Sequence, residues 1–286
     1  MNKVSNYASL VKFSHTIFAM PFALLAFVYA LVSTATPFDW LLLVKVLVCM
    51  VSARNAAMGF NRWLDRDIDA ANPRTAGRDI PAGRISPRAA MIFVVVNCVI
   101  FVLGAWWINT LALALSPVAL VVLLGYSCTK RFTSLSHLVL GLALGIAPVG
   151  AYIAVTGSFA AMPCLLALAV MTWTAGFDIL YSMQDVAFDR SHALHSVPAR
   201  FTLVQSTLIS LALHAVALVA VIGIGAGYGF GWWYWIGTAL FTVILVVQHI
   251  LYRPSHIDRI GATFGLVNGL ASVTYALLAI IDLLVR

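Results

Sequence analysis

Two sets of oxygen-bearing side chains recur in this chain at a spacing that suits metal chemistry. The first set is Asn61, Asp65 and Asp69, which stand four residues apart at the end of a long apolar run. Residues four apart on a helix point in similar directions and rise by about 6 Å per step, so they form a ladder along one face. Carboxylate and amide oxygens are ligands that Mg²⁺ prefers. We therefore predict that this first ladder binds Mg²⁺.

The second ladder is Tyr181, Asp185 and Asp189, which repeats the same spacing 120 residues later, again after an apolar run. The chain has ten acidic residues, all of them Asp, and four lie on the two ladders. For either ladder alone, an ordinary polar helix end in a cytoplasmic loop is the alternative. Two matched ladders in a chain so poor in acids favour a functional site, because acids beside apolar spans are costly.

The composition indicates a membrane protein with several spans. Of the 286 residues, 62% are apolar and 9% are charged, and the mean hydropathy is +0.99. Such values are typical of polytopic membrane proteins and not of soluble cores. The four cysteines are scattered without a Cys-x-x-Cys pair, so we interpret them as small apolar residues. We recognise no pattern of a cleavable signal peptide.

Long apolar runs predict an all-α fold in a single transmembrane domain of residues 1–286. Backbone hydrogen bonds must be satisfied internally in lipid, so each run is expected to form a helix of a bundle around a central cavity. There are nine such runs, and they cover residues 16–34, 39–60, 89–108, 111–127, 135–155, 161–183, 201–223, 231–251 and 260–284.

Basic residues collect in alternate loops, which predicts the orientation in the membrane. Counted along the nine spans, 15 of the 17 Lys and Arg residues fall on one side; Lys45 and Arg286 are the exceptions. The 15 include Lys3, Lys12, Arg253 and Arg259. Because such residues collect on the cytoplasmic side, we predict a cytoplasmic N-terminus and an active site that faces the cytoplasm from the inner membrane. The net charge of +7 then reflects orientation, and we predict contact with membrane lipid but no nucleic-acid partner.

A polar loop follows each ladder. Residues 70–88 contain three prolines, two glycines and several arginines, so they cannot continue a helix. This loop is too long and too basic for a simple connector. It is either a solvated positive loop or a basic lid over an anionic ligand, in which case residues 190–200 are its counterpart.

Acids, arginines and apolar spans together predict a reaction of diphosphates. Acids alone repel a diphosphate, so a metal ion must bridge them, while Arg and Lys bind phosphate oxygens directly. An allylic prenyl diphosphate would lose its diphosphate with the help of Mg²⁺, and an electron-rich acceptor would attack the cation, shielded from water. The sequence contains no closely spaced set of His and Cys ligands, no Gly-x-x-x-x-Gly-Lys loop and no Gly-x-Ser-x-Gly elbow, which argues against zinc, P-loop and hydrolase chemistry.

These motifs resemble those of the UbiA superfamily of intramembrane prenyltransferases. Residues 54–69 with 72–75 resemble its first signature, and residues 178–189 with 194–201 resemble its second. Tyr126 with Lys130 and Arg131 resembles a further family motif, and the resemblance extends over the whole chain. The second signature is similar to that of the 4-hydroxybenzoate polyprenyltransferase branch, which includes relatives that act on dihydroxynaphthoates.

The resemblance implies an activity and a set of roles. The implied activity is Mg²⁺-dependent transfer of a polyprenyl group from polyprenyl diphosphate to a ring carbon of an aromatic acid. The acid would be 4-hydroxybenzoate or a dihydroxynaphthoate, in ubiquinone or menaquinone biosynthesis. The implied Mg²⁺ ligands are Asn61, Asp65, Asp69, Asp185 and Asp189, and the implied diphosphate contacts are Arg62, Lys130 and Arg131.

Three further residues have expected roles near the acceptor. Arg54 stands two helical turns before Asn61 on the same face, deeper in the predicted cavity. A buried arginine needs an anionic partner, and our hypothesis is the carboxylate of the aromatic acid; a salt bridge to Asp178 or to a ladder aspartate is the alternative. As catalytic residues we assign Tyr181, which is expected to hydrogen-bond a phosphate or an aspartate, and Asp178, which orients the acceptor or takes up its proton.

Two other functions stay open at this point. Within the enzyme class, the acceptor would be of the haem or chlorophyll type, which needs a wider cavity. In a different class, a transporter would also carry paired intramembrane acids and a repeat. Against transport, the acids gather at one membrane face, and the outer halves of the spans offer no second polar gate.

Several polar residues of the spans have only a structural interpretation. We expect them to pack between helices or to lie at the membrane interface, and the position of Lys45 has no explanation in the sequence. The packing residues are His214, His249, Asn268 and Asp282, and the interfacial residues are His15 and His137.

Overall fold

The computed structural model describes residues 7, 9–11, 18–252 and 260–286, and all regular secondary structure among them is helical. The chain separates into two compact units. The first unit is Met1–Thr16 with Trp40–Cys128, and the second is Ile17–Asp39 with Thr129–Arg286. Each unit is considered by itself. The prediction of an all-α fold is confirmed, and the single domain of residues 1–286 stays a prediction.

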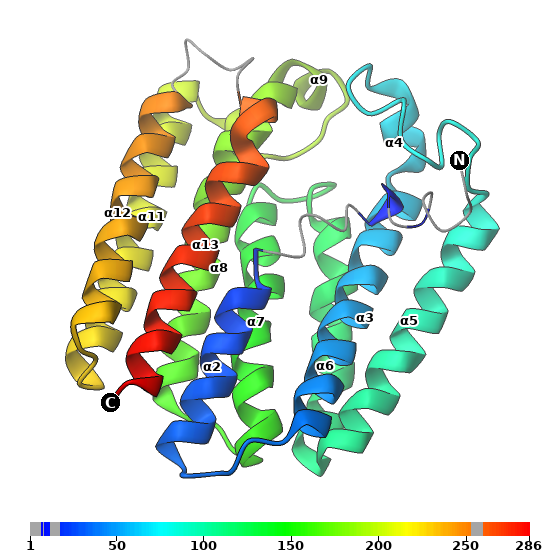
Figure 1. The fold of residues 1–286 in the computed structure, drawn as a ribbon. Coiled ribbons are helices and arrows are strands. Elements are labelled where there is room, and N and C mark those ends of the chain that lie inside the picture. Colours follow the sequence, from blue (N-terminus) through cyan, green and yellow to red (C-terminus); the bar gives the residue numbers. More distant parts are fainter. Residues whose placement is uncertain (1–6, 8, 12–17, 253–259) are drawn as a thin grey trace. The chain divides into compact units, whose positions relative to one another are not determined.

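The first unit consists of α3 (Trp40–Leu64), α4 (Arg66–Ala71), α5 (Pro87–Ile108) and α6 (Thr110–Thr129). The long helices α3 and α5 pack along one another (Figure 1). The Nζ atom of Lys45 on α3 donates to the carbonyl oxygen of Trp107 on α5 at 3.2 Å. The same ammonium lies 4.6 Å from the centre of the Trp107 ring. Lys45 therefore ties α3 to the last turn of α5, which accounts for a charge that the sequence left unexplained.

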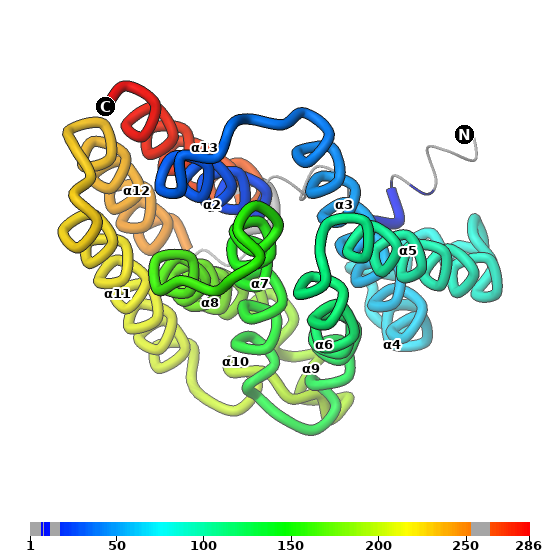
Figure 2. The backbone as a smooth tube through the Cα atoms, turned by 90° about the horizontal axis from the view of Figure 1, so that it is seen from below, coloured from blue at the N-terminus to red at the C-terminus, as the bar shows by residue number. Residues whose placement is uncertain are grey.

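The second unit contains the remaining helices. They are α2 (Met20–Ser33), α7 (Ser136–Thr156), α8 (Ala161–Ser182), α9 (Val186–Ser191), α10 (Val197–Arg200), α11 (Leu203–Gly227), α12 (Trp232–Leu251) and α13 (Ile260–Leu284). Helix α8 is the centre of the unit, because it packs against both α7 and α11 (Figure 2). Its Trp173 is fully buried and touches the aromatic rings of Phe22, Phe177 and Phe241.

Polar side chains within the second unit join helices to one another. His214 on α11 and His249 on α12 are hydrogen-bonded at 2.9 Å, between Nδ1 of the first and Nε2 of the second. The carboxylate of Asp282 on α13 accepts from the backbone N–H of Gly231, at 2.8 Å. Because Gly231 precedes the first residue of α12, Asp282 caps that helix from a neighbouring one. These contacts support the structural interpretation of the three residues.

Buried amides link α12 and α13 in the same way. The Nε2 atom of Gln248 lies 3.4 Å from Oδ1 of Asn268, and Nδ2 of Asn268 donates to the carbonyl oxygen of Phe264 at 3.0 Å. Both amide side chains are fully buried. Asn268 therefore packs between these helices, as the sequence predicts.

Among the residues that the structure describes, eight helices are long and apolar enough to cross a membrane. They are α3, α5, α6, α7, α8 (extended through α9), α11, α12 and α13. The first predicted span, 16–34, corresponds to α2, whose 14 helical residues are fewer than such a crossing needs. The exact count of nine and the orientation stay predictions, and Lys3, Lys12, Arg253, Arg259 and His15 lie outside the described residues.

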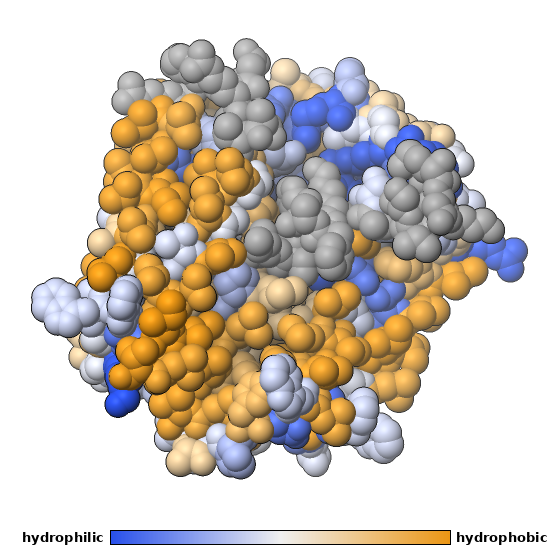
Figure 3. Space-filling model, in the orientation of Figure 1, coloured by the Kyte–Doolittle hydropathy of each residue, from blue (hydrophilic) through white to orange (hydrophobic). Residues whose placement is uncertain are grey.

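Large apolar side chains cover the outer faces of the long helices. On α12, Val243, Val246 and Ile250 are each more than half exposed and follow one another at helical spacing. The space-filling view shows hydrophobic surface over this part of the second unit (Figure 3). An exposed apolar stripe on a helix of this length suits contact with lipid, so the chain is a multi-pass membrane protein.

Candidate active site

The first ladder lies where α3 gives way to α4. The backbone of Asp65, with φ −91° and ψ 5°, separates the two helices. Helical hydrogen bonds nevertheless continue through it, from Asp65 N to Asn61 O at 3.0 Å and from Asp69 N to Asp65 O at 2.7 Å. The side-chain amide of Asn61 also donates to Oδ2 of Asp65, at 3.2 Å. The helical spacing of the three residues is thus kept across the junction, although Asn61 lies on α3, Asp69 on α4 and Asp65 between the two helices.

Asp69 is the residue of the first ladder whose surroundings best fit a cation ligand. Its carboxylate is buried, and its Oδ1 atom accepts from Nη1 of Arg78 at 2.6 Å. The other oxygen, Oδ2, is buried without a hydrogen-bond partner in the part of the chain that the structure describes. A buried carboxylate oxygen without a partner is unfavourable, whereas a bound cation would satisfy it.

Positive charge lies next to the first ladder. Arg62 is buried, with 7% of its surface exposed, and interacts electrostatically with Asp65 and Asp69. Tyr126 on α6 lies within electrostatic range of both Arg54 and Arg62. The first unit therefore brings together the ladder, the predicted diphosphate contact Arg62 and the predicted acceptor contact Arg54.

The basic loop after the first ladder is folded onto its own unit. Arg84 donates from Nε to Oδ1 of Asp79 at 2.8 Å and from Nη2 to the carbonyl oxygen of Gly77 at 2.7 Å. Ile80 and Ile85 are buried in a small apolar cluster that also contains Leu10 and Ala90. Such packing is more than a solvated positive loop requires, while the role of a lid stays a prediction.

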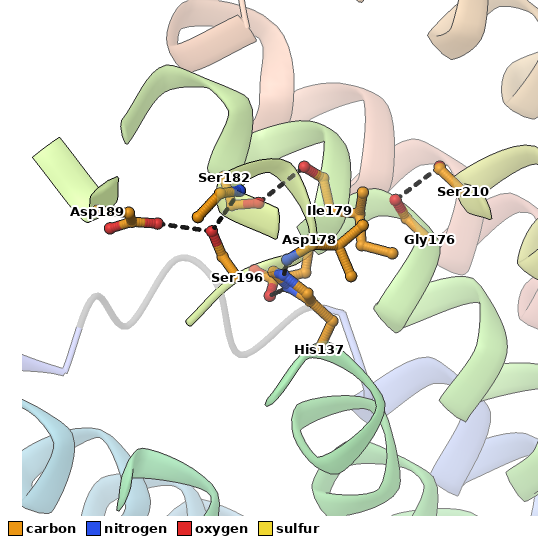
Figure 4. Close-up of polar contacts among 10 residues, drawn as sticks. His137, Gly176, Asp178, Ile179, Ser182, Asp189, Ser196 and Ser210 are labelled. Atoms are coloured by element: carbon orange, nitrogen blue, oxygen red, sulfur yellow. Dashed lines mark hydrogen bonds and ion pairs between the residues drawn. The ribbon is translucent and has the colours of Figure 1, made fainter. Parts of the chain in front are cut away.

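The second ladder begins on α8 and continues past a break. Helix α8 ends at Ser182, the 3-10 helix η2 covers Met183–Asp185, and α9 begins at Val186. The backbone of Asp185 has φ −103° and ψ 4°. The hydroxyl of Ser196 donates to Oδ2 of Asp189 at 2.8 Å (Figure 4). Asp189 also interacts electrostatically with Asp185 and Lys130.

The turn between α6 and α7 presents the other predicted basic residues. The backbone N–H groups of Phe132 and Thr133 both bond to the carbonyl oxygen of Thr129, which closes a tight turn around Lys130 and Arg131. The N–H of His195 donates to the carbonyl oxygen of Lys130 at 2.7 Å. The segment after the second ladder is thus fixed to the turn that carries Lys130, and the second unit brings Lys130 and Asp189 together.

The two predicted catalytic residues lie on the last turns of α8. The ring of Tyr181 packs on the ring of Phe264 of α13, with 4.4 Å between centroids. Asp178 accepts a hydrogen bond at Oδ2 from Nδ1 of His137, at 2.7 Å (Figure 4). A quarter of the Asp178 side chain is exposed. The carboxylate of Asp178 is therefore held by His137, while part of the side chain stays accessible to another molecule.

His137 is a residue that the sequence reasoning misplaced. It was expected at the membrane interface, but the structure buries it, with 4% of its surface exposed. Its partner Asp178 is 41 residues away in the chain, so no local spacing pattern relates the two. The sequence offers one indirect sign that His137 is buried: Gly141 follows it by four residues and so lies on the same face of α7, and a glycine on a helix face often marks close packing against another helix.

The donors of each ladder are of the kind that divalent cations bind. Within either unit, the described residues include no group of three or more His, Cys, Asp or Glu side chains placed to hold a metal ion. Mg²⁺ commonly takes one or two carboxylates and completes its shell with water and phosphate oxygens. Each ladder offers two carboxylates, and the partnerless Oδ2 of Asp69 fits a cation ligand.

Comparison with known proteins gives consistent results. Residues 19–273 match the model of the UbiA prenyltransferase family. A 4-hydroxybenzoate octaprenyltransferase of Aliivibrio fischeri is 33% identical over 186 residues, which cover 65% of each chain. A protein of the same name from Photobacterium profundum is 39% identical over 144 residues, half of each chain. These matches span less than two thirds of the relatives' length.

Solved structures show the same fold. A UbiA homologue from Aeropyrum pernix K1, in its apo form, has a TM-score of 0.83 and 34% sequence identity; the match covers 94% of this chain and 98% of that one. A UbiA homologue from Archaeoglobus fulgidus bound to DMAPP and Mg²⁺ has a TM-score of 0.69 at 18% identity, with 96% and 99% of the chains covered. The second likeness concerns the fold alone.

Proposed function

The chain belongs to the UbiA prenyltransferase family, and from this premise we propose that it transfers a polyprenyl group from polyprenyl diphosphate to a ring carbon of an aromatic acid. The acceptor is 4-hydroxybenzoate or a dihydroxynaphthoate, and the product is a precursor of ubiquinone or menaquinone. The names of the relatives from Aliivibrio fischeri and Photobacterium profundum, 4-hydroxybenzoate octaprenyltransferase, support the first acceptor.

The observation that carries this proposal is the pair of matched ladders at the ends of two long apolar helices. Between Asp65 and Asp185 the chain forms four helices that are long and apolar enough to cross a membrane. If each of the four crosses the membrane, the even number of crossings returns the chain to the same side, which supports our proposal that both ladders face the cytoplasm. Two sets of carboxylates at one face are suited to a shared diphosphate.

We assign the diphosphate end of the substrate to the ladders and the basic residues beside them. Mg²⁺, when bound, supplies positive charge that stabilises the departing diphosphate. The ligands that hold it are Asn61, Asp65, Asp69, Asp185 and Asp189. Arg62, Lys130 and Arg131 bind phosphate oxygens directly, because their charge offsets that of the leaving group.

We assign the acceptor end to residues closer to the middle of the spans. Arg54, two turns before the first ladder, pairs with the carboxylate of the aromatic acid. Asp178 accepts a hydrogen bond from the acceptor and takes up the proton that the substituted ring loses. Tyr181, the first residue of the second ladder, instead belongs to the diphosphate end, where it hydrogen-bonds the diphosphate or a neighbouring aspartate. The apolar spans keep water from the cationic prenyl group.

The location follows from the same assignment. We propose nine transmembrane helices with a cytoplasmic N-terminus, in the inner membrane, with the ladders at the cytoplasmic face. The excess of Lys and Arg in alternate loops supports this orientation. The soluble diphosphate end then enters from the cytoplasm, while the prenyl tail stays in contact with lipid.

Product formation by the purified protein tests the proposal. Detergent-solubilised protein is incubated with a polyprenyl diphosphate, Mg²⁺ and either 4-hydroxybenzoate or a dihydroxynaphthoate, and the prenylated acid is measured by mass spectrometry. We expect one acid to be prenylated, EDTA to stop the reaction and added Mg²⁺ to restore it. Turnover without a sealed membrane excludes a purely vectorial role. Lack of product with both acids, or a reaction unaffected by EDTA, would refute the proposal.

A further inference from the structure

His137 stands between two partners that fix its protonation pattern. Its Nε2 atom lies 3.2 Å from the backbone nitrogen of Val197, and its Nδ1 atom lies 2.7 Å from Oδ2 of Asp178. A backbone N–H only donates, so Nε2 must accept and therefore carries no proton. The proton of the neutral ring is on Nδ1, which donates to the Asp178 carboxylate.

Close packing of two helices places His137 beside Asp178. Gly141 and Gly145 follow His137 at steps of four on α7, so the three residues share one face. A Cβ atom on Gly141 would collide with the carbonyl oxygen of Met171, and one on Gly145 would lie 2.8 Å from that of Ala167. The backbone of α8 therefore touches this face of α7.

The direction of packing extends this contact to Asp178. As the residue number rises along α7, from Gly141 to Gly145, its partner on α8 falls from Met171 to Ala167. The helices are therefore antiparallel, and His137, one turn before Gly141, lies opposite the turn of α8 that follows Met171. That turn leads to Asp178, and the hydrogen bond of 2.7 Å completes the contact.

The other partner of His137 belongs to the segment that also holds the second ladder. The hydroxyl of Ser196 donates to Asp189 (Figure 4). The N–H of the next residue, Val197, donates to His137. Ser196 also caps α10 by accepting from the N–H of Ala199 at 3.2 Å. Two adjacent residues thus hold Asp189 directly and Asp178 through the imidazole.

We propose that His137 is a positioning residue for the acceptor chemistry, which holds Asp178 by its Oδ2 atom so that Oδ1 is directed to the acceptor. This inference rests on the proposed prenyl transfer. A hydrogen bond to a carboxylate is charge-assisted, so it restrains the side chain more strongly than a neutral one. Without it, Asp178 on the last turns of α8 is free to adopt other rotamers, and the geometry of proton uptake is lost.

Two substitutions separate the role of His137 toward Asp178 from its role toward the loop. The side-chain amide of Asn lies about as far from the backbone as Nδ1 of His, and that of Gln lies about as far as Nε2. His137→Asn therefore keeps a donor for Asp178 and gives up Val197, whereas His137→Gln keeps an acceptor for Val197 and gives up Asp178. Activity and loop protection are measured on the same purified proteins, whose folding is checked by gel filtration.

We expect the two variants to differ in opposite ways in acceptor kinetics and in hydrogen exchange at Val197. For His137→Gln, kcat/KM for the acceptor should fall at least about tenfold, the loss expected for one hydrogen bond to a charged group. The KM for the prenyl diphosphate should stay unchanged. For His137→Asn, activity should stay within a factor of about three, while hydrogen exchange of the peptide that contains Val197 becomes faster.

A double substitution adds an independent check. If His137 acts through Asp178, the loss in His137→Gln should not add to the loss in Asp178→Asn. Normal kcat/KM in His137→Gln would overturn the positioning role. So would a loss of activity in His137→Asn that accompanies faster hydrogen exchange at Val197. The proposed function fails separately: it is refuted if the wild-type protein prenylates no acid. The positioning role alone is refuted if the wild-type protein is active and His137→Gln is equally active.

Discussion

Asp65 and Asp185 adopt the same backbone conformation at equivalent points of two segments that lie 120 residues apart. Each is the middle rung of its ladder, and each precedes a helix of six residues. Their φ and ψ values are −91° and 5° for the first and −103° and 4° for the second. This region is sparsely populated and often holds turn residues and active-site residues. The match therefore extends from residue types to local structure.

The first prediction concerns these two carboxylates. If the proposed metal role is correct, Asp65→Asn and Asp185→Asn should each lower kcat by about 100-fold or more, because each would remove a charge that helps the metal to stabilise the departing diphosphate. Initial rates of product formation at saturating substrates measure the effect. Thermal unfolding in detergent should be close to that of the wild-type protein.

Asp67→Asn is the matched control for the first ladder. Its side chain is 84% exposed and forms only a long contact of 3.5 Å with Arg66, which contributes little at the surface. Its rate should stay within a factor of about two of the wild-type rate, the range usual for surface changes. Near-normal turnover in Asp65→Asn or Asp185→Asn would remove the metal role from that ladder.

Local spacing was sufficient to predict most of the helices and the helical spacing of the first ladder. Periodicity and hydropathy are properties of a few consecutive helical turns, so they predict where the apolar helices lie. A spacing of four residues predicts that side chains share one face of a helix. They do not report pairs that are distant in sequence. Lys45 and Trp107, 62 residues apart, and His137 and Asp178, 41 apart, meet only because specific helices pack together. The breaks at Asp65 and Asp185 were also missed, because neither position contains a proline or glycine.

The second prediction concerns Arg78, which the sequence did not single out. It donates to Asp69 at 2.6 Å, so it holds a proposed metal ligand and would add positive charge beside the proposed diphosphate site. Arg78→Ala should raise KM for the prenyl diphosphate by about tenfold, the effect of losing one charge-assisted hydrogen bond.

Arg84→Ala is the control within the same loop. Arg84 binds Asp79, which is not on the ladder. Its loss should lower thermal stability without changing KM for the prenyl diphosphate. Equal changes in KM for the two variants would mean that the loop as a whole, and not the contact with Asp69, matters.

The third prediction concerns the acceptor. If Arg54 pairs with a carboxylate, Arg54→Ala should lower kcat/KM for an aromatic acid by at least about tenfold. The same substitution should change kcat/KM much less for a phenol of similar size that lacks the carboxylate. The ratio of the two values, measured at saturating prenyl diphosphate, isolates the contact. Equal losses for both acceptors would reject the assignment.

The fourth prediction tests the close approach of α7 and α8 that presents His137 to Asp178. Gly141→Ala would drive a Cβ atom into the carbonyl oxygen of Met171, so the two helices would have to separate. Overpacking of this kind costs about 1–3 kcal/mol, enough to lower the unfolding temperature by several degrees. Gly150→Ala on the same helix has no atom within 4 Å of the added Cβ and should leave the unfolding temperature unchanged or slightly higher. Thermal unfolding of both variants in detergent makes the comparison, and equal stability of the two would contradict the contact between the α7 face and the α8 backbone.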